Sequence, residues 1–431
     1  MLRADISAIR RLADQRGLPL CDAVLRALRE SALAGEPAPT LLAVCPNSEA
    51  VVKAAVLASR EAEAPLCFAA TLNQIDGDGG YTGWTQPQFV ALVRECVEEL
   101  GYTGPVVVGL DHGGPWLKDL QTREQWPLER AMQGVKDSLV ACLEAGYDLL
   151  HVDPTVDRTL PPDQPLPVDR VVERTLELVG HAEVHRRRGN LPPVSYEVGT
   201  EEVHGGLADL TVFERFLSGL RSGLAARGFS DTWPCFVVGK VGTDLHTTLF
   251  DPEVARDLVV TAASYGTVIK GHYTDYVTNP EDYPRTGMGG ANVGPEFTES
   301  EYGALEQLAR REDALVEEQQ IARPSGLLPA LREAVIASAR WQKWLQPDER
   351  GVSFERLASE RQGWLICTGC RYIWAVPGVV SARRRLYTNL AAAGEPNEDF
   401  VLRAIADRIT HYYRAFGTAG TLERIRSALA A

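Results

Sequence analysis

Long apolar runs are missing from this 431-residue sequence. No stretch reaches the roughly 18 apolar residues of a transmembrane helix, so no spanning segment is expected. The opening residues, MLRADISAIRRLADQRG, lack the apolar core of a secretory signal, which predicts a cytoplasmic protein. Basic residues are also scarce, with 44 Lys and Arg against 58 Asp and Glu and a net charge of −14. This balance argues against nucleic acid or an anionic membrane as a partner.

The signatures of several other functional classes are absent. No GxxxxGK[ST] or GxGxxG motif follows a strand-like run, so nucleotide binding has no support, and no GxSxG elbow marks a hydrolase. The eight cysteines are scattered, and the Cys367–Cys370 pair has no second pair to complete a zinc site. We therefore expect free thiols in a reducing compartment. The Asp-Gly-Asp-Gly run at 76–79 lacks the closing Glu of a calcium loop and predicts a turn.

What is present is a regular alternation of short apolar runs and helical segments. Apolar runs without strict alternation, joined by helices, are typical of parallel strands buried on both faces. Their number is that of a (β/α)8 TIM barrel, an α/β fold, with a doubly wound open sheet as the alternative. The expected strands are Leu41–Cys45, Leu66–Thr71, Val106–Leu110, Leu149–Val152, Val194–Val198, Cys235–Val238, Val268–Lys270 and Gly290–Val293.

The chain divides into three predicted parts. Residues 1–39 form N-terminal helices, 40–320 form the barrel, and 321–431 form a helical C-terminal extension that begins at an IARPSG linker. One connection breaks the pattern, because Tyr273–Met288 is too rich in Pro, Asn and Gly for an ordinary helix. We expect it to be a functional loop that covers the mouth of the barrel.

Polar residues gather just after the predicted strands. Because the carboxyl ends of the strands meet at one mouth of a barrel, these side chains are expected to lie close together. Of eight His in the chain, the four at positions 112, 151, 246 and 272 fall at or just past strand ends. Imidazoles and carboxylates gathered at one mouth suit a divalent metal, and we predict His112, His246 and His272 as its ligands.

Taken in order, the motifs after the strands resemble a known family. They are Asn73-Gln74 with Gly79-Gly80-Tyr81-Thr82-Gly83, Asp111-His112-x-Gly-Pro115, Gly199-Thr200-Glu201, His272-x-Thr274-Asp275-Tyr276 and Val293-Gly294-Pro295. This series resembles the accessory, or non-catalytic, subunits of class II D-tagatose-1,6-bisphosphate aldolases, a family that includes related ketose C4-epimerases. The resemblance implies a TIM barrel of the zinc-dependent class II type.

The resemblance also implies roles for individual residues. Asp111 would be the catalytic acid/base, and His112, His246 and His272 would hold Zn²⁺, with Mn²⁺ as the alternative. Glu197 or Glu201 would be a fourth ligand or would orient a ligand imidazole, and Glu197, Glu201 and Asp153 are the next candidates for the base. The expected substrate-binding residues are Asn73, Gln74, Tyr81, Asp275, Asn292 and Glu296.

The sequence departs from the family in its phosphate-binding features. The Gly-Gly-Ser-Gly loop of catalytic class II aldolases is missing after the seventh strand, and Glu296 would repel a nearby phosphate. Because few cations follow the predicted strands, an unphosphorylated, polyol-type sugar is the favoured substrate.

Two functions remain open. The first is a metal-dependent sugar enzyme that acts on a ketose or ketose phosphate by retro-aldol and aldol chemistry, as a C4-epimerase or an aldolase. The second is a non-catalytic subunit that stabilises a separate aldolase. The retained Asp111 and the three predicted His ligands favour the enzyme. In either case we expect a homo-oligomer.

Overall fold

The computed structural model describes residues 3–30, 32, 35–161, 164, 166–199, 209–243 and 249–431. No single helix in these ranges has the length and hydropathy of a membrane span. The bent pair Ser359–Tyr372 and Pro377–Ala392 passes the same test only when its two halves are counted together.

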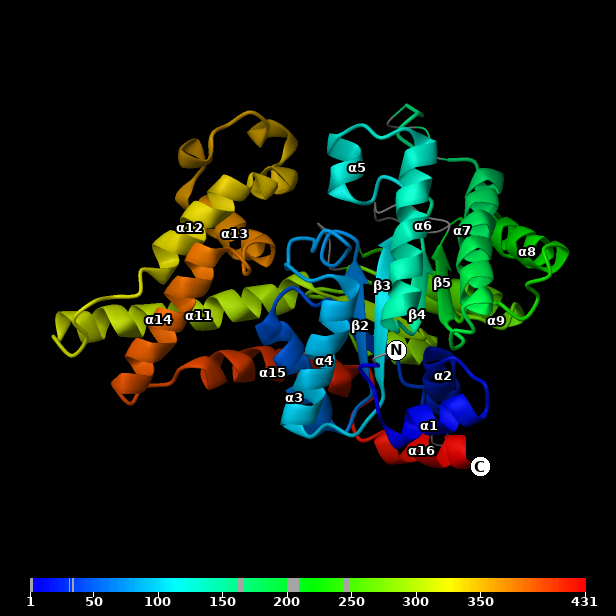
Figure 1. Ribbon diagram of the computed structural model, residues 1–431, viewed down its shortest axis with the longest axis horizontal. Coiled ribbons are helices and arrows are strands. Elements are labelled where there is room, and N and C mark those ends of the chain that lie inside the picture. The colour runs from blue at the N-terminus through cyan, green and yellow to red at the C-terminus, as the bar shows by residue number, and fades with distance from the viewer. Residues whose placement is uncertain are drawn as a thin grey trace.

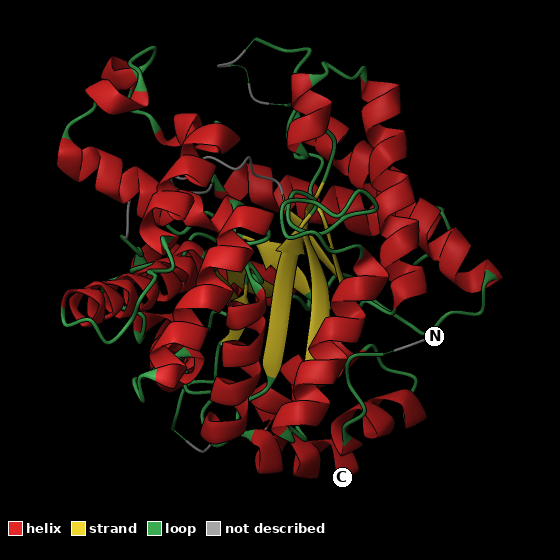
Figure 2. Cartoon of the chain, turned by 60° about the vertical axis from the view of Figure 1, so that its left-hand side comes forward, coloured by secondary structure: helices red, strands yellow, loops and turns green. Residues whose placement is uncertain are grey.

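Eight parallel strands close into a barrel in which each strand pairs with its neighbour in sequence and β1 pairs with β8. Figure 2 shows the strands surrounded by helices. This confirms the (β/α)8 fold and excludes the open sheet. The strands are β1 (Leu41–Val44), β2 (Leu66–Thr71), β3 (Val106–Gly113), β4 (Leu149–Val152), β5 (Ser195–Gly199), β6 (Phe236–Val238), β7 (Val268–Gly271) and β8 (Gly290–Val293). Their apolar side chains are buried on both faces because helices cover the outside and side chains fill the inside.

Helices follow the strands and form the outer layer. They are α3 (Glu49–Ala62), α4 (Gln86–Leu100), α5 (Asp119–Arg123), α6 (Leu128–Ala145), α7 (Val168–Arg188), α8 (Leu210–Ala226), α9 (Pro252–Ser264), α10 (Asp282–Thr286) and α11 (Pro295–Glu317). Several begin at a side chain that accepts a backbone N–H, as Ser48 does for α3 and Asp251 for α9.

The connection between β7 and β8 is only partly a loop. Tyr273 and Asp275 line the cavity at the barrel mouth, as expected. The second half forms α10, whose Tyr283 is fully buried and stacks on Phe250 at 4.1 Å between ring centroids. Apolar packing of this tyrosine thus fixes half of a segment whose Pro and Gly content predicted an open loop.

At the end of the barrel where the strands begin, the interior is largely apolar and is closed by the two ends of the chain. Helices α1 (Ala8–Gln15), α2 (Leu20–Glu30) and α16 (Leu422–Ala430) lie together at this end (Figure 1). Their apolar faces form one cluster with inward side chains of the strands, which include Leu41, Cys67, Val107, Leu149, Phe236 and Val268. The buried Asp111 and His151 lie towards the opposite end, where the strands terminate, whereas Ser195 of β5 lies at this end and accepts a hydrogen bond of 3.2 Å from the backbone N–H of Asp22 in α2.

The chain after residue 321 first leaves the barrel and then returns to it. We call residues 321–397 the C-terminal arm; it contains α12 (Leu327–Ser338), α13 (Ser359–Gly369) and α14 (Pro377–Ala392) and projects to one side in Figure 1. Helix α15 (Glu398–Ala415) runs back along α11 and α3, and its Tyr413 shares a hydrogen bond of 2.6 Å with Ser59 of α3. The arm is therefore held to the barrel at both of its ends.

Candidate metal centre at the barrel mouth

Two consecutive residues of β3, Asp111 and His112, both reach the mouth of the barrel. Side chains alternate along a regular strand, so neighbours normally point to opposite faces. Here the pairing of β3 with β4 shifts register between Leu110 and Gly113, and His112 has a left-handed backbone with φ of 50°. This bulge turns both side chains into the same cavity. The apolar pattern predicts a strand that ends at Leu110, whereas β3 continues to Gly113.

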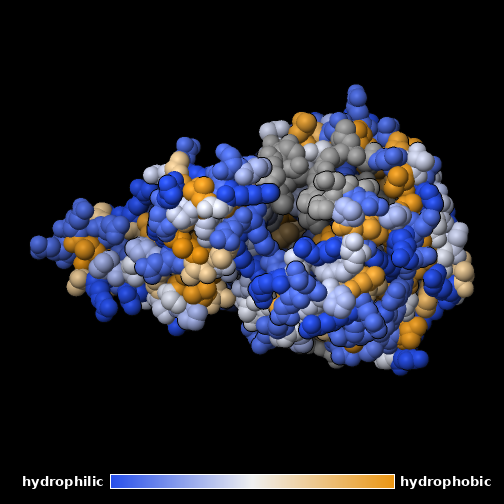
Figure 3. Space-filling model, turned by 90° about the horizontal axis from the view of Figure 1, so that it is seen from above, coloured by the Kyte–Doolittle hydropathy of each residue, from blue (hydrophilic) through white to orange (hydrophobic). Residues whose placement is uncertain are grey.

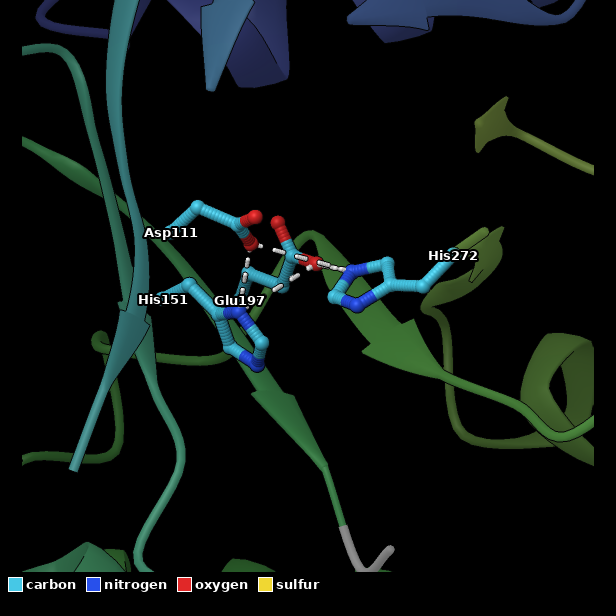
Figure 4. A group of neighbouring side chains, drawn as sticks. All are labelled: Asp111, His151, Glu197 and His272. Atoms are coloured by element: carbon cyan, nitrogen blue, oxygen red, sulfur yellow. Dashed lines mark hydrogen bonds and ion pairs between the residues drawn. The ribbon is translucent and has the colours of Figure 1, made fainter. Parts of the chain in front are cut away.

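Three imidazoles face one another at this point. The ring centroids of His112 and His151 are 5.1 Å apart, those of His112 and His272 4.8 Å, and those of His151 and His272 5.2 Å. They come from β3, from β4 and from the residue that follows β7, and Figure 4 shows His151 and His272 converging on Asp111 and Glu197.

Carboxylates lie among these rings. Asp111 Oδ1 is 3.0 Å from His151 Nδ1, and Asp111 Oδ2 accepts a hydrogen bond of 3.1 Å from the amide of Asn292. Glu197 Oε1 is 2.9 Å from His272 Nε2. Asp153 Oδ2 is 2.6 Å from His112 Nδ1, which leaves His112 Nε2 directed towards Asp111 at 3.9 Å.

A buried lysine partly balances these carboxylates. Lys270 of β7 is only 1% exposed, and its Nζ lies 2.6 Å from Glu197 Oε2. Burial would raise the pKa of Glu197, but Lys270, His151 and His272 together outweigh it and lower that pKa to about 2. Glu197 is therefore an anion at neutral pH.

The same competition acts on Asp111 and His112. Burial would raise the pKa of Asp111, but the charge of His112, the hydrogen bond with His151 and the charge of Lys270 hold it well below 3.8. Burial would lower the pKa of His112, but Asp111 and Asp153 raise it to about 9. Burial lowers the pKa of His272, which favours its neutral form. Three buried carboxylates thus face one lysine and draw a proton onto His112, so this site attracts positive charge.

The donor set fits a divalent cation of the Zn²⁺ or Mn²⁺ type. Asp111, His151, Glu197 and His272 each offer a ligand atom, and these atoms all lie within 4.8 Å of one another. Imidazoles around one tetrahedral ion would have ring centroids about 5 Å apart, close to the separations observed. Buried His151 Nε2 and Asn292 Oδ1 have no hydrogen-bond partner, which leaves unused polar atoms beside this group.

A cavity of about 310 Å³ opens above this group, with Asp111, His112 and His272 at its barrel end. Figure 3 looks onto this face and shows a hollow between the C-terminal arm and the barrel. The opposite wall comes from the arm and includes Arg340, Lys343 and Arg371. The expectation of few cations near the mouth is wrong, because the arm brings three of them there.

The predicted sugar-binding residues have different surroundings. Asn73, Gln74 and Tyr81 line the cavity, but their polar atoms already bond within the protein: Gln74 and Tyr81 both donate to Asn47 Oδ1 at 2.9 Å. Asn73 donates to the carbonyl of Leu117 at 2.8 Å. These contacts shape the cavity wall.

Asp275, Asn292 and Glu296 also differ from one another. Asn292 lines the cavity and bonds to Asp111, whereas Asp275 lines it while accepting the backbone N–H groups of Gly294 and Glu296 at 3.0 and 2.8 Å. Glu296 is buried away from the lining and contacts Arg408 and Tyr412. It therefore does not face the cavity, and the repulsion of phosphate expected from it loses its basis.

Some predicted site residues cannot be placed, and others were missed. His246 and Glu201 lie outside the described residues. The structure brings His112 and His272 together as expected, with Asp111, Asp153 and Glu197 beside them. His151 was seen at a strand end but not proposed as a ligand, and Lys270 was not singled out. The pattern His-Val-Asp-Pro, which begins within the last two residues of the fourth apolar run, was the available signal for His151.

Comparisons with known proteins agree with this architecture. A family model described as D-tagatose-1,6-bisphosphate aldolase subunit GatZ/KbaZ-like matches residues 25–415. A crystal structure of a probable tagatose 6 phosphate kinase from Sinorhizobium meliloti 1021 is similar, at 21% identity and a TM-score of 0.70, over 87% of this chain and 100% of that chain. Fructose-bisphosphate aldolase (Fba) from Campylobacter jejuni is also similar, at 10% identity and a TM-score of 0.52, over 92% of both chains. Likeness at these identities establishes the shared fold.

Proposed function

Because the chain belongs to the GatZ/KbaZ-like family of D-tagatose-1,6-bisphosphate aldolase subunits, we propose that it is itself a metal-dependent sugar enzyme. In this proposal it acts on a ketose or ketose phosphate by retro-aldol and aldol chemistry, as a C4-epimerase or a class II aldolase. The observation that carries the proposal is the buried group of Asp111, His151, Glu197 and His272 beneath an open cavity. A purely structural subunit has no physical need for such a group, since buried carboxylates cost stability unless they are compensated.

His112, His151 and His272 would hold the divalent ion, with Glu197 as the adjoining carboxylate. Asp153 would orient His112 through Nδ1, and Lys270 would fix Glu197 in its ionised form. When bound, such an ion supplies a Lewis acid that polarises the ketose carbonyl. His246 and Glu201 stay as proposed alternatives from the family pattern.

Asp111 would move the proton. Its carboxylate is ionised at neutral pH, lines the cavity and is held in place by Asn292. It would accept the proton of the C4 hydroxyl as the C3–C4 bond breaks, and return it when the bond re-forms. The electron pair of the C3–C4 bond would stay on the ketose fragment as an enediolate. If the aldehyde fragment leaves and the enediolate takes up a proton at C3, the reaction is that of an aldolase; if the fragment re-adds on its other face, the product is the C4 epimer.

Metal content and turnover of the chain purified alone test the proposal. We expect about one Zn²⁺ or Mn²⁺ per chain and turnover of at least one ketose or ketose phosphate. His151→Ala should lower metal content and turnover together, because it removes one of three converging imidazoles. The matched control is His411→Ala, which changes an exposed imidazole on α15. Full metal occupancy in His151→Ala would contradict the assigned ligands.

A stabilising subunit is the second candidate, because the family description is that of an aldolase subunit. It predicts a metal-free chain with no turnover of its own that increases the activity of a separate class II aldolase. Mixing the purified chain with such an aldolase, with and without added Zn²⁺, separates the two functions.

A further inference from the structure

The cavity wall that the C-terminal arm contributes consists of cationic and aromatic side chains. Arg340, Lys343, Trp344, Arg371 and Tyr372 of the arm line the same cavity as Asp111 and His112. We propose that this wall binds an anionic group, a phosphoryl or a carboxylate, at the end of the sugar remote from the reacting carbons. Arg371 is the residue that recognises it. This inference rests on the proposed function for the identity of the ligand as a ketose.

Arg371 is a buried cation without a carboxylate partner. It is 8% exposed and lies in the turn that follows α13. Its Nε donates to the carbonyl of Thr368 at 2.9 Å and its Nη2 to Thr368 Oγ1 at 2.5 Å. Within the described part of the chain, no carboxylate lies within ion-pair distance of it. Burying an unpaired charge is unfavourable unless an anion compensates it, so a ligand anion would supply the missing partner.

Aromatic rings hold this guanidinium in position. Its carbon lies 4.6 Å from the ring centroid of Trp344 and 5.6 Å from that of Tyr372. Planar guanidinium groups match phosphate and carboxylate oxygens in pairs, so a fixed orientation favours these two anions. The side chain is therefore pre-organised towards the cavity that it lines.

Arg340 and Lys343 add positive charge beside Arg371. Both pair with the single carboxylate of Asp119, at 3.3 Å for Arg340 and 2.5 Å for Lys343. The Arg340 guanidinium also lies 4.9 Å from the ring centroid of Tyr372, the ring that Arg371 contacts as well. Three cations at this wall thus face one paired carboxylate, which leaves the wall positive.

The remaining acidic groups do not cancel this charge. Asp275 lines the same cavity and accepts two backbone N–H groups through Oδ1, and burial raises its pKa to about 7, so it carries only part of a negative charge at neutral pH. Glu296 is outside the lining and in contact with Arg408. Asp111 lies at the barrel end of the cavity, beneath the site of chemistry. The cavity therefore has a metal-binding end on the strands and a cationic end on the arm, which suits a sugar with one charged terminus.

Equilibrium binding tests this inference independently of turnover. Fructose, fructose 6-phosphate and the corresponding 6-carboxylate are titrated into the metal-loaded protein by calorimetry. We expect at least one of the two acidic sugars to bind about 10 to 100 times more tightly than fructose, as a charged hydrogen-bonding group typically contributes. The tighter of the two identifies the anion as phosphoryl or carboxylate. Equal affinities for all three sugars would overturn the inference.

Variants assign the effect to Arg371. Arg371→Met should remove most of the preference for the acidic sugar and leave fructose binding unchanged, while Arg371→Lys should restore part of it. The control is Arg384→Met, an exposed arginine of α14. If Arg371→Met does not fold, added NaCl provides the test in the wild-type protein, because salt should weaken binding of the acidic sugar only. An Arg371-dependent preference without turnover would contradict the enzyme and support this inference.

Discussion

Asp111 has a setting in which an ionised carboxylate is both stable and accessible. Burial alone would favour its protonated form, but the surrounding imidazoles and Lys270 stabilise the anion. Asn292 fixes the oxygen that does not face His151. Asp111 is thus an oriented, ionised carboxylate at the edge of the cavity, which is the protonation state that a general base requires.

Replacing this carboxylate separates proton transfer from metal binding. We expect Asp111→Asn to lower turnover by roughly 10² to 10⁴, the usual contribution of a general base, while metal content stays near that of the wild type. Asp137→Asn, at an exposed position of α6, is the matched control. Steady-state rates with metal analysis of the same samples provide the measurement. Activity close to wild type would move the base to Glu197 or Asp153.

Glu301 makes the stability of the fold depend on pH. This α11 side chain is fully buried, accepts a hydrogen bond of 2.6 Å from Ser48, and lies 3.5 Å from Arg383. Burial raises the pKa of Glu301 from 4.5 to about 7. Between these values the folded state keeps a proton that the unfolded state releases, so this group's contribution to stability falls as pH rises through the window.

Glu301→Gln removes this titration. Its free energy of unfolding relative to wild type should therefore increase between about pH 4.5 and pH 7, by at most roughly 1.4 kcal/mol per pH unit, and stay constant above that range. Urea unfolding at pH 5 and pH 8 measures the change, with Glu317→Gln at an exposed position of α11 as the control. Parallel pH profiles for Glu301→Gln and wild type would contradict the assignment.

Among the structural elements, the connection after β2 shows how glycine positions a cavity wall. Gly80 has φ of 54°, and a Cβ there would lie 2.2 Å from the carbonyl oxygen of Gln74. Gly77 in the same connection has open space around it. The fold of the segment that holds Gln74 and Tyr81 therefore depends on Gly80 and not on Gly77.

These two glycines form a matched pair of variants. We expect Gly80→Ala to lower the free energy of unfolding by roughly 1–3 kcal/mol. The new methyl group would displace the backbone at Gln74, and the positive φ of residue 80 is unfavourable for alanine. Gly77→Ala should stay within about 0.5 kcal/mol of wild type. Thermal unfolding measures both, and equal effects would show that this backbone approach does not limit stability.

The strands were predictable from sequence, and the bulge in β3 was not. Apolar runs such as Leu66–Thr71 report burial on both faces directly, and the observed β2 has these bounds. Asp111, His112 and Gly113 are not typical strand formers; their place in β3 depends on pairing with β4, which no local pattern encodes.

The part of the site that consists of residues at the ends of strands was predictable from the sequence. The rule that strand ends meet at one mouth placed Asp111, His112, Glu197 and His272 together correctly. It did not separate His151 from its neighbours, because four residues of β4 show too little alternation to tell an inward side chain from an outward one. The cations of the arm could not be predicted for another reason, because Arg371 and Asp111 line the same cavity only as a result of tertiary packing.

At the scale of the whole molecule, the two ends of the cavity come from different parts of the chain. The strands supply Asp111, His112 and His272, and the arm supplies Arg340, Lys343 and Arg371. Helices α11 and α15 connect the arm to the barrel on either side, and α15 continues to α16, which covers the far end of the barrel (Figure 1). The arm is therefore an excursion between two anchored helices and not a free tail.

An excursion of this kind can be altered without altering the rest of the fold. Substitutions within residues 321–397 would change the cavity wall that carries Arg340, Lys343 and Arg371, while the strand ends and the helices that seal the barrel keep their own contacts. This independence gives a protein engineer a defined stretch to randomise, bounded by α11 and α15, when a new sugar is wanted on an old reaction centre.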